Sequence, residues 1–138
     1  MVKAVEFWDA KAEGYAKSSA GNEEVYKEKL EATRRYFDAD SQVFEFGCGT
    51  VSTALHHAPF VHKIVATDIS SNMIEIARRK ALEANITNVE FQCSALEDFK
   101  AVDASFNVVM PIAFCTYWKI QSRQSSFLTD YLSPAACL

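Results

Sequence analysis

Two closely spaced glycines that follow a short apolar segment constrain the fold of this chain more than any other feature. The sequence holds four glycines in 138 residues, against an average usage of roughly 7%, and none follows Gly49. Gly47 and Gly49 come directly after residues 42–46, whose alternating apolar positions predict a strand. A turn without side chains at two positions lets a ligand reach the backbone, and the N–H groups of a following helix point at that ligand.

Segments with strand and helix patterns alternate along the chain. We expect helices over residues 22–37, 53–58 and 71–84, the last capped by Ser70 or Ser71, and strands over 42–46, 62–67, 88–92 and 106–110. This alternation is typical of βαβ units, which build an α/β fold around a parallel sheet with helices on its faces. In such sheets a ligand binds beyond the carboxyl ends of the strands, where the strand order reverses, so we expect the site at the glycine turn.

Composition restricts the class of protein further. Hydrophobic residues make up 49% of the chain and charged residues 23%, which predicts a single globular domain over residues 1–138. Eighteen acidic residues outnumber 14 basic ones, so no overall positive field attracts nucleic acid or an anionic membrane, and we expect neither as a partner. The apolar runs are too short for a membrane span or a signal peptide, and a cytoplasmic location is expected.

Two carboxylates stand beside the predicted turn. Asp68 ends the second strand pattern about 20 residues after the glycines, the spacing at which an acid accepts hydrogen bonds from ribose hydroxyls. Glu45 precedes the glycines, where it would repel the pyrophosphate of NAD but attract S-adenosylmethionine, which carries an ammonium and a sulfonium group. Taken singly, the glycines predict an ordinary turn and Asp68 a helix cap. Together they favour a site for the cationic cofactor, with a dinucleotide-binding oxidoreductase domain as the weaker alternative.

The segments around these carboxylates, residues 45–50 and 64–77, resemble the first two motifs of the class I S-adenosylmethionine-dependent methyltransferases. Residues 7–15 also resemble the N-terminal segment of small-molecule-type members of that family. The resemblance runs from about residue 7 to Met110 and implies a cofactor-binding core over residues 42–110. The expected fold is then a Rossmann-like three-layer sandwich with a parallel sheet that is incomplete at its C-terminal strands.

The same resemblance implies a set of residues that would bind S-adenosylmethionine. Its methionine end would contact Gly47, Cys48 and Gly49, with Glu45 beside it. Its ribose and adenine would contact Asp68 and Ile69, and the adenine ring would also contact Ala95 and Leu96. Tyr15 would close over the cofactor, and Met73 completes the set. The implied activity is methyl transfer to an unidentified small-molecule acceptor. No catalytic residue is nominated, because the rate of such a displacement comes largely from holding donor and acceptor in line.

Histidine spacing does not predict a metal site. His56 and His57 are adjacent, so on a helix they face different directions, and no acid stands at ligand spacing from them or from His62.

Two positions inside the core depart from the family pattern. Val51 stands where the family usually has a third glycine, and a β-branched residue is unfavourable there if the turn needs a positive φ. Ser94 replaces an acid often found after the third strand, which removes a hydrogen-bond acceptor for the adenine amino group.

Residues 111–138 diverge from the family completely. Suitable codons for the last five residues, read in a shifted frame, encode the Pro-Gly-Gly turn that the family carries, so we hypothesise that this tail is frameshifted; a divergent or truncated natural chain is the alternative. Either way the strands that complete the sheet are missing, which predicts an open edge on the fourth strand and self-association through it. A second functional hypothesis is therefore an inactive fragment of such an enzyme, with or without cofactor binding.

Overall fold

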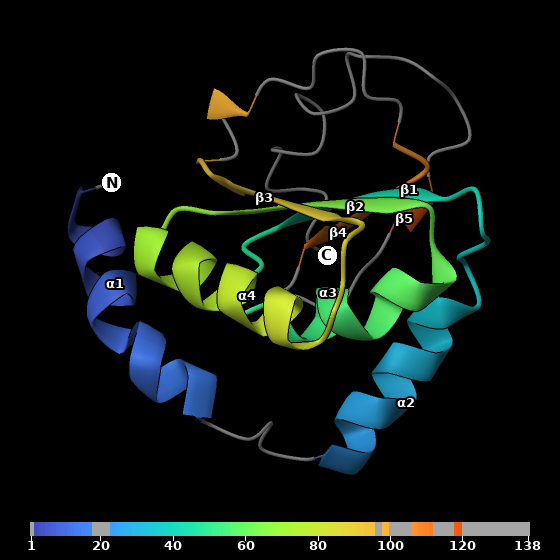
Figure 1. Ribbon diagram of the computed structural model, residues 1–138, viewed down its shortest axis with the longest axis horizontal. Helices are drawn as coiled ribbons and strands as arrows, with labels where there is room; N and C mark the ends of the chain where they lie inside the picture. The colour runs from blue at the N-terminus through green and yellow to red at the C-terminus, as the bar shows by residue number, and fades with distance from the viewer. Residues whose placement is uncertain (1, 18–22, 96–97, 100–105, 112–117, 120–138) are drawn as a thin grey trace.

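The computed structural model describes residues 2–17, 23–95, 98–99, 106–111 and 118–119 (Figure 1). Its elements, in chain order, are α1 (Val2–Lys17), α2 (Glu23–Arg34), β1 (Gln42–Phe46), α3 (Ser52–His57), the 3-10 turn η1 (Ala58–Phe60), β2 (Lys63–Asp68), α4 (Ser71–Glu83), β3 (Val89–Cys93), β4 (Val108–Pro111) and β5 (Trp118–Lys119).

The strands form one sheet in the order β3-β2-β1-β4-β5, with the first four strands parallel and β5 antiparallel to β4. The prediction of an α/β fold with a parallel sheet is confirmed. Because the chain continues from β1 to β2 on one side and reaches β4 on the other, the strand order reverses at the carboxyl end of β1. The glycine turn lies at that point.

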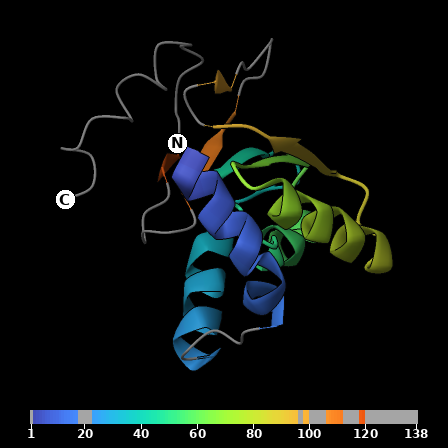
Figure 2. The same cartoon turned by 90° about the vertical axis from the view of Figure 1, so that its left-hand side faces the viewer.

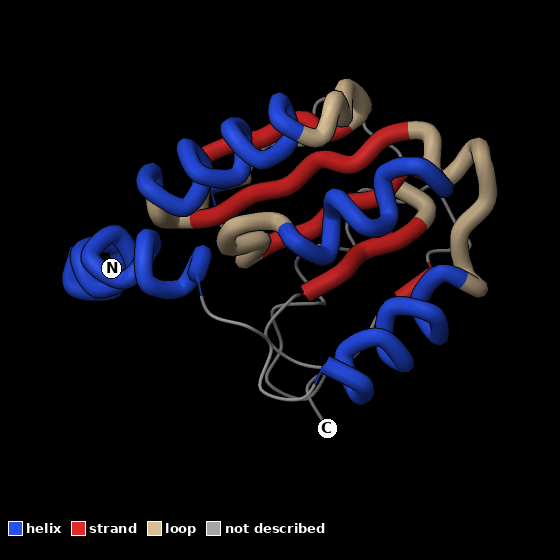
Figure 3. The backbone as a smooth tube through the Cα atoms, turned by 60° about the horizontal axis from the view of Figure 1, so that its bottom comes forward, coloured by secondary structure: helices blue, strands red, loops and turns tan. Residues whose placement is uncertain are grey.

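Helices α3 and α4 pack on one face of the sheet, with α2 against α3 and α1 against α4 (Figures 1 and 3). Helix α1 lies at the carboxyl ends of the strands, beside the start of α4, and α2 lies near their amino ends (Figure 1). Among the described residues helices cover only this face, so the third layer of the predicted sandwich is not tested by them.

Most elements lie close to their predicted positions. Strand β1 has the predicted bounds, and Ser70 caps α4 by accepting a hydrogen bond of 3.1 Å from the N–H of Met73. Helix α2 is shorter than the predicted 22–37 and ends at Arg34, while the expected cap Asn22 lies outside the described residues.

Helix α1, strand β5 and the short turn η1 were not predicted. Helix α1 escapes the pattern because it buries the small Ala12 and exposes its large Phe7 and Trp8. Strand β5 pairs with Val108 and Val109, so the expectation of an open edge on the fourth strand is wrong along these two residues. Most of the proposed frameshifted tail lies outside the described residues, and the coding DNA after Met110 remains its test.

The core divides between the two faces of the sheet. On the helical face the side chains of Val43, Ile64 and Val108 pack against Ala54 and Ala77. On the other face Phe44 lies against Phe99, with ring centroids 4.3 Å apart and the rings stacked, and Phe46 and Phe106 extend this aromatic cluster. Side chains alternate along a strand, so Glu45 shares the helical face with Val43. A carboxylate therefore enters the apolar core.

His57 predicts a pH-dependent contribution to stability. Its ring is fully buried against Phe37 (centroids 4.8 Å apart), and neither ring nitrogen has a hydrogen-bond partner among the described residues. Burial, and then the neighbouring His56, lower the pKa of His57 from 6.5 to about 4. The unfolded chain therefore binds a proton before the folded chain does, and His57 reduces stability as pH falls through 6.5 toward 4.

Relative to His57→Leu, the wild-type chain should lose about 2 kcal/mol of unfolding free energy between pH 7 and pH 5. Urea denaturation at the two pH values measures this difference. The matched control is His62→Gln, because His62 is exposed and its replacement should leave the difference intact. If the difference in unfolding free energy between wild type and His57→Leu is the same at pH 7 and pH 5, the prediction is contradicted.

Candidate functional site

The glycine turn after β1 has an unusual backbone. Gly47, Gly49 and Val51 all adopt positive φ angles, of 65°, 53° and 57°. Between them, the N–H of Cys48 donates a hydrogen bond of 2.9 Å to the carbonyl oxygen of Thr67, which ties the turn to the end of β2. Glycine reaches this left-handed region without steric cost, which explains two of the three positions.

Val51 has the backbone conformation for which a third glycine would be suited, as the sequence comparison with the family pattern anticipates. Its side chain is nevertheless fully buried, in the core with Ala54. The left-handed conformation costs roughly 1–2 kcal/mol, whereas burial of a valine side chain contributes roughly 1.5–3 kcal/mol. Packing therefore outweighs backbone strain at this position.

Val51→Gly is expected to lower the unfolding free energy by about 1–2 kcal/mol, because the lost packing and the added chain flexibility of glycine exceed the relieved strain. Urea denaturation measures the change. Val51→Ala is the matched control, since it loses packing but keeps the cost of a positive φ. A Val51→Gly chain more stable than wild type would contradict this balance.

Asp68 joins the turn to the start of α4. One carboxylate oxygen accepts a hydrogen bond of 2.9 Å from the N–H of Gly49, and the other accepts one of 2.9 Å from the N–H of Ser70. Each carboxylate oxygen has a second lone pair, so the group keeps capacity for further donors. The sequence predicted a ligand-binding role for Asp68; its part in holding the turn is an additional finding.

Glu45 is buried without a partner. Its side chain is fully buried, and neither carboxylate oxygen has a hydrogen-bond partner among the described residues. Its neighbours in register are Ala66 on β2 and Met110 on β4. Burial raises the pKa of Glu45 from 4.5 to about 8. When this carboxyl group is ionised it has no counter-charge among the described residues, so a cation placed beside it would stabilise the ionised form.

The thiol of Cys48 is affected by both carboxylates. Burial raises the pKa of its thiol, and the charges of Glu45 and Asp68 raise it further. Glu45 and Asp68 therefore lie at the same edge of the sheet, close enough for both to act on one side chain. Both carboxylates thus lie at the carboxyl ends of neighbouring strands, as the sequence predicts.

A cavity of about 290 Å³ opens next to this edge. Its lining combines the segment after β2 with the segment after β3, and includes one residue of α1: Val5, Ile69, Cys93, Ser94, Ala95 and Asp98. The structure thus brings together Ile69 and Ala95, two of the residues expected to bind adenine. Leu96 lies outside the described residues.

Four lining residues were not among those expected to bind the cofactor: Val5, Cys93, Ser94 and Asp98. Of these, only Ser94 was noticed in the sequence, as a departure from the family pattern. Asp98 could have been noticed as an acid four residues after Ser94, whereas no local signal places Val5 there.

The other expected residues occupy two different environments. Tyr15 lies against the turn, since a Cβ atom at Gly49 would be 3.3 Å from its ring atom Cε1. Met73 is buried between α1 and α4, where it packs with Ala12 and Ile76 instead of lining the cavity.

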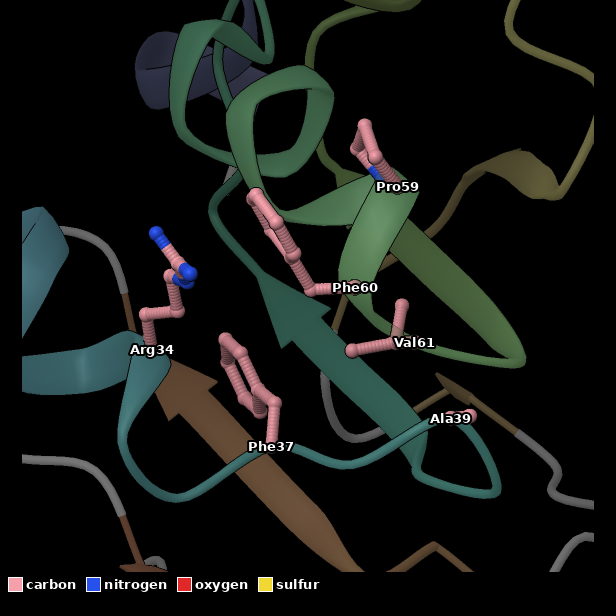
Figure 4. A pocket seen from close by; sticks show the side chains of 6 residues that line it. All are labelled: Arg34, Phe37, Ala39, Pro59, Phe60 and Val61. Carbon is pink, nitrogen blue, oxygen red and sulfur yellow. The ribbon is translucent and has the colours of Figure 1, made fainter.

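A second cavity, of about 400 Å³, lies away from the turn, near the amino end of β1 (Figure 4). The guanidinium carbon of Arg34 lies 4.2 Å from the ring centroid of Phe60 at its wall. None of the residues expected to bind a cofactor lines it. Among the described residues no group of three or more histidine, cysteine or acidic side chains could hold a metal ion, and no helix is long and apolar enough to cross a membrane.

Comparison with known proteins decides the family. Residues 43–129 match the family described as "Methyltransferase domain". The chain belongs to the class I S-adenosylmethionine-dependent methyltransferases. The match covers the glycine turn, Asp68 and the lining segments after β2 and β3.

Several curated methyltransferases resemble the chain in sequence. It is 32% identical over 71 residues to the uncharacterized methyltransferase YcgJ of Bacillus subtilis. It is 32% identical over 68 residues to a 2-heptyl-1-hydroxyquinolin-4(1H)-one methyltransferase of Mycobacteroides abscessus. It is 38% identical over 61 residues to the tRNA (uracil-5-)-methyltransferase homolog A of Mus musculus. These matches cover 51%, 49% and 44% of the chain but only 28%, 30% and 10% of the relatives.

Solved structures agree with the family and the fold. The YcgJ crystal structure superposes with a TM-score of 0.58 at 28% identity, covering 62% of this chain and 37% of YcgJ. The structure of a DhpI–SAH complex superposes with a TM-score of 0.63 at 22% identity, covering 78% of this chain and 50% of DhpI. The chain shares their Rossmann-like sheet but spans half or less of their length.

Proposed function

We propose that this methyltransferase binds S-adenosylmethionine at the carboxyl ends of β1 and β2 and transfers its methyl group to a small-molecule acceptor. The observation that carries the proposal is Glu45, a fully buried carboxyl group whose oxygens have no partner among the described residues. A cationic ligand at the turn provides the missing counter-charge. A phosphate-bearing dinucleotide does not, because its charge has the same sign as that of Glu45.

The chain's own residues provide one contact for each part of the cofactor. Glu45 faces the ammonium group, directly or through water, and the free lone pairs of Asp68 accept from the ribose hydroxyls. The cavity next to Ile69 and Ala95 holds the adenine ring. Asp98, at the lining of this cavity, offers a carboxylate to the adenine amino group in place of the acid that Ser94 replaces.

When bound, S-adenosylmethionine would supply a methyl group on a sulfonium sulfur. A nucleophile of the acceptor bonds to the methyl carbon from the side opposite the sulfur, and S-adenosylhomocysteine leaves as the methyl–sulfur bond breaks. The turn holds the donor against the backbone of Gly47 and Gly49, and Tyr15 covers it from α1. Positioning of this kind contributes the larger part of the rate of such a reaction. A small acceptor is favoured over nucleic acid because the chain carries a net charge of −4.

Calorimetric titration with S-adenosylmethionine, S-adenosylhomocysteine and NAD tests the cofactor. We expect the two sulfur compounds to bind and NAD not to bind; NAD binding alone overturns the proposal. Release of S-adenosylhomocysteine in the presence of a panel of small nucleophiles then tests transfer. Cofactor binding without release in any condition supports the alternative, an inactive cofactor-binding fragment, which the positive φ of Val51 favours.

A further inference from the structure

Helix α1 packs closely along α4. Ala12 is 1% exposed and contacts Met73 and Ile76, and Ala16 lies at the margin of this small cluster. Because the buried residue on α1 is an alanine, the two helices approach closely at this point. Figure 2 shows α1 in front of the sheet edge, beside α4. This apolar contact buries Met73 and Ile76 against α1 but leaves the larger Phe7 and Trp8 of α1 exposed.

Asp9 supplies the polar part of this attachment. Its carboxylate accepts a hydrogen bond from the hydroxyl of Ser70 and another, of 3.2 Å, from the N–H of Asn72. In return the side-chain amide of Asn72 donates to the backbone carbonyl oxygen of Asp9 at 3.1 Å. A negative charge at the first turn of α4 also interacts favourably with the positive end of that helix.

Ser70 connects this attachment to the cofactor-binding turn. The residue is fully buried, and its N–H donates to one oxygen of Asp68, whose other oxygen accepts from Gly49. A continuous set of hydrogen bonds thus runs from Asp9 through Ser70 and Asp68 to Gly49. Ser70, which bonds to Asp9 of α1, is therefore only two residues from Asp68, which we propose faces the ribose.

Both halves of α1 reach the site on either side of Asp9. Val5 lines the cavity with Ile69 and Ala95, and Tyr15 lies against Gly49. Ten residues of helix span roughly 15 Å, so α1 extends from the adenine end of the site to its methionine end.

We propose that Asp9 is a positioning residue that fastens α1 across the bound cofactor, so that breaking its hydrogen bonds to Ser70 and Asn72 releases the cofactor faster. The inference rests on the proposed S-adenosylmethionine site and adds to it the part that retains the ligand. Asp9 itself does not touch the cofactor; it acts through the placement of Val5 and Tyr15.

The test compares Asp9→Ala, Asp9→Asn and the control Glu13→Ala, an exposed carboxylate removed from the same helix. S-adenosylhomocysteine affinity and dissociation rate are measured on each, together with hydrogen exchange in α1 and in β1. We expect Asp9→Ala to weaken affinity about tenfold, mainly through faster dissociation, and to raise exchange in α1 but not in β1. Asp9→Asn keeps an acceptor and should recover part of the affinity, and Glu13→Ala should match wild type.

Two results overturn the proposed role of Asp9 in different ways. If wild type binds and Asp9→Ala binds with the same dissociation rate while α1 exchanges faster, the helix does not retain the ligand. If exchange in α1 does not change, Asp9 does not fasten it. If wild type binds neither S-adenosylmethionine nor S-adenosylhomocysteine, the proposed function is overturned, and the role of Asp9 with it. The failure of the function and the failure of the Asp9 proposal are therefore distinguishable.

Discussion

Replacing Asp68 with alanine is expected to weaken binding of S-adenosylmethionine and S-adenosylhomocysteine about 100-fold. The carboxylate is positioned at the end of β2 with unused lone pairs, and hydrogen bonds from ribose hydroxyls to a charged group contribute roughly 1.5–3 kcal/mol each. Two such bonds correspond to a factor of about 100 or more. Isothermal titration calorimetry on both ligands measures the loss.

The same change removes the acceptor for two backbone N–H groups, those of Gly49 and Ser70. Asp68→Ala should therefore also be less stable, by about 3 kcal/mol. Asp68→Asn keeps one side-chain oxygen and is the variant to use if the alanine protein does not fold. Its affinity for the two ligands should lie between those of wild type and Asp68→Ala. Wild-type affinity in a folded Asp68→Ala protein contradicts the assignment of the nucleoside site.

The second large effect concerns the charge state of Glu45. With a pKa of about 8, most of this carboxyl group is protonated at pH 7 when no ligand is bound. A cation at the turn favours the ionised form, so binding must release a proton. Between pH 5.5 and pH 7 the affinity for S-adenosylmethionine should rise about tenfold per pH unit, because only the ionised fraction binds the cation well.

Titrations at pH 7 in buffers with different ionisation enthalpies measure the released proton directly. Glu45→Gln should bind both sulfur compounds at least tenfold more weakly and with no such proton release. Glu83→Gln makes the same chemical change at an exposed site and should behave as wild type. Proton release that persists in Glu45→Gln would show that another group responds to the ligand.

Local signals account for the parts of the fold and site that could be predicted. Strand β1 alternates apolar and polar residues, Gly47 and Gly49 mark the turn, and Ser70 caps α4, so each is legible in its own few residues. The meeting of Glu45 and Asp68 followed from a general rule about parallel strands.

What could not be predicted depends on contacts between distant segments. Val5 joins the cavity because α1 lies on α4, and α1 gave no helical pattern since its buried position is an alanine. The unpartnered state of Glu45 depends on Ala66 and Met110 beside it, on two other strands. The bonds from Asp9 to Ser70 and Asn72 cross about 60 positions in sequence, a distance that no window of local pattern spans.

The two uncharged, buried ionisable groups act on stability in opposite directions. His57 makes the fold weaker toward acid, whereas the raised pKa of Glu45 makes it weaker as pH rises from 4.5 toward 8, by about 3 kcal/mol between pH 5 and pH 8. Between about pH 5 and pH 6 the two effects offset each other and stability stays nearly constant, because each changes by about 1 kcal/mol in opposite directions. Above pH 6.5 the change from His57 is nearly complete while that from Glu45 continues, so stability declines toward pH 8. The level part of the profile conceals a compensation that either single replacement removes.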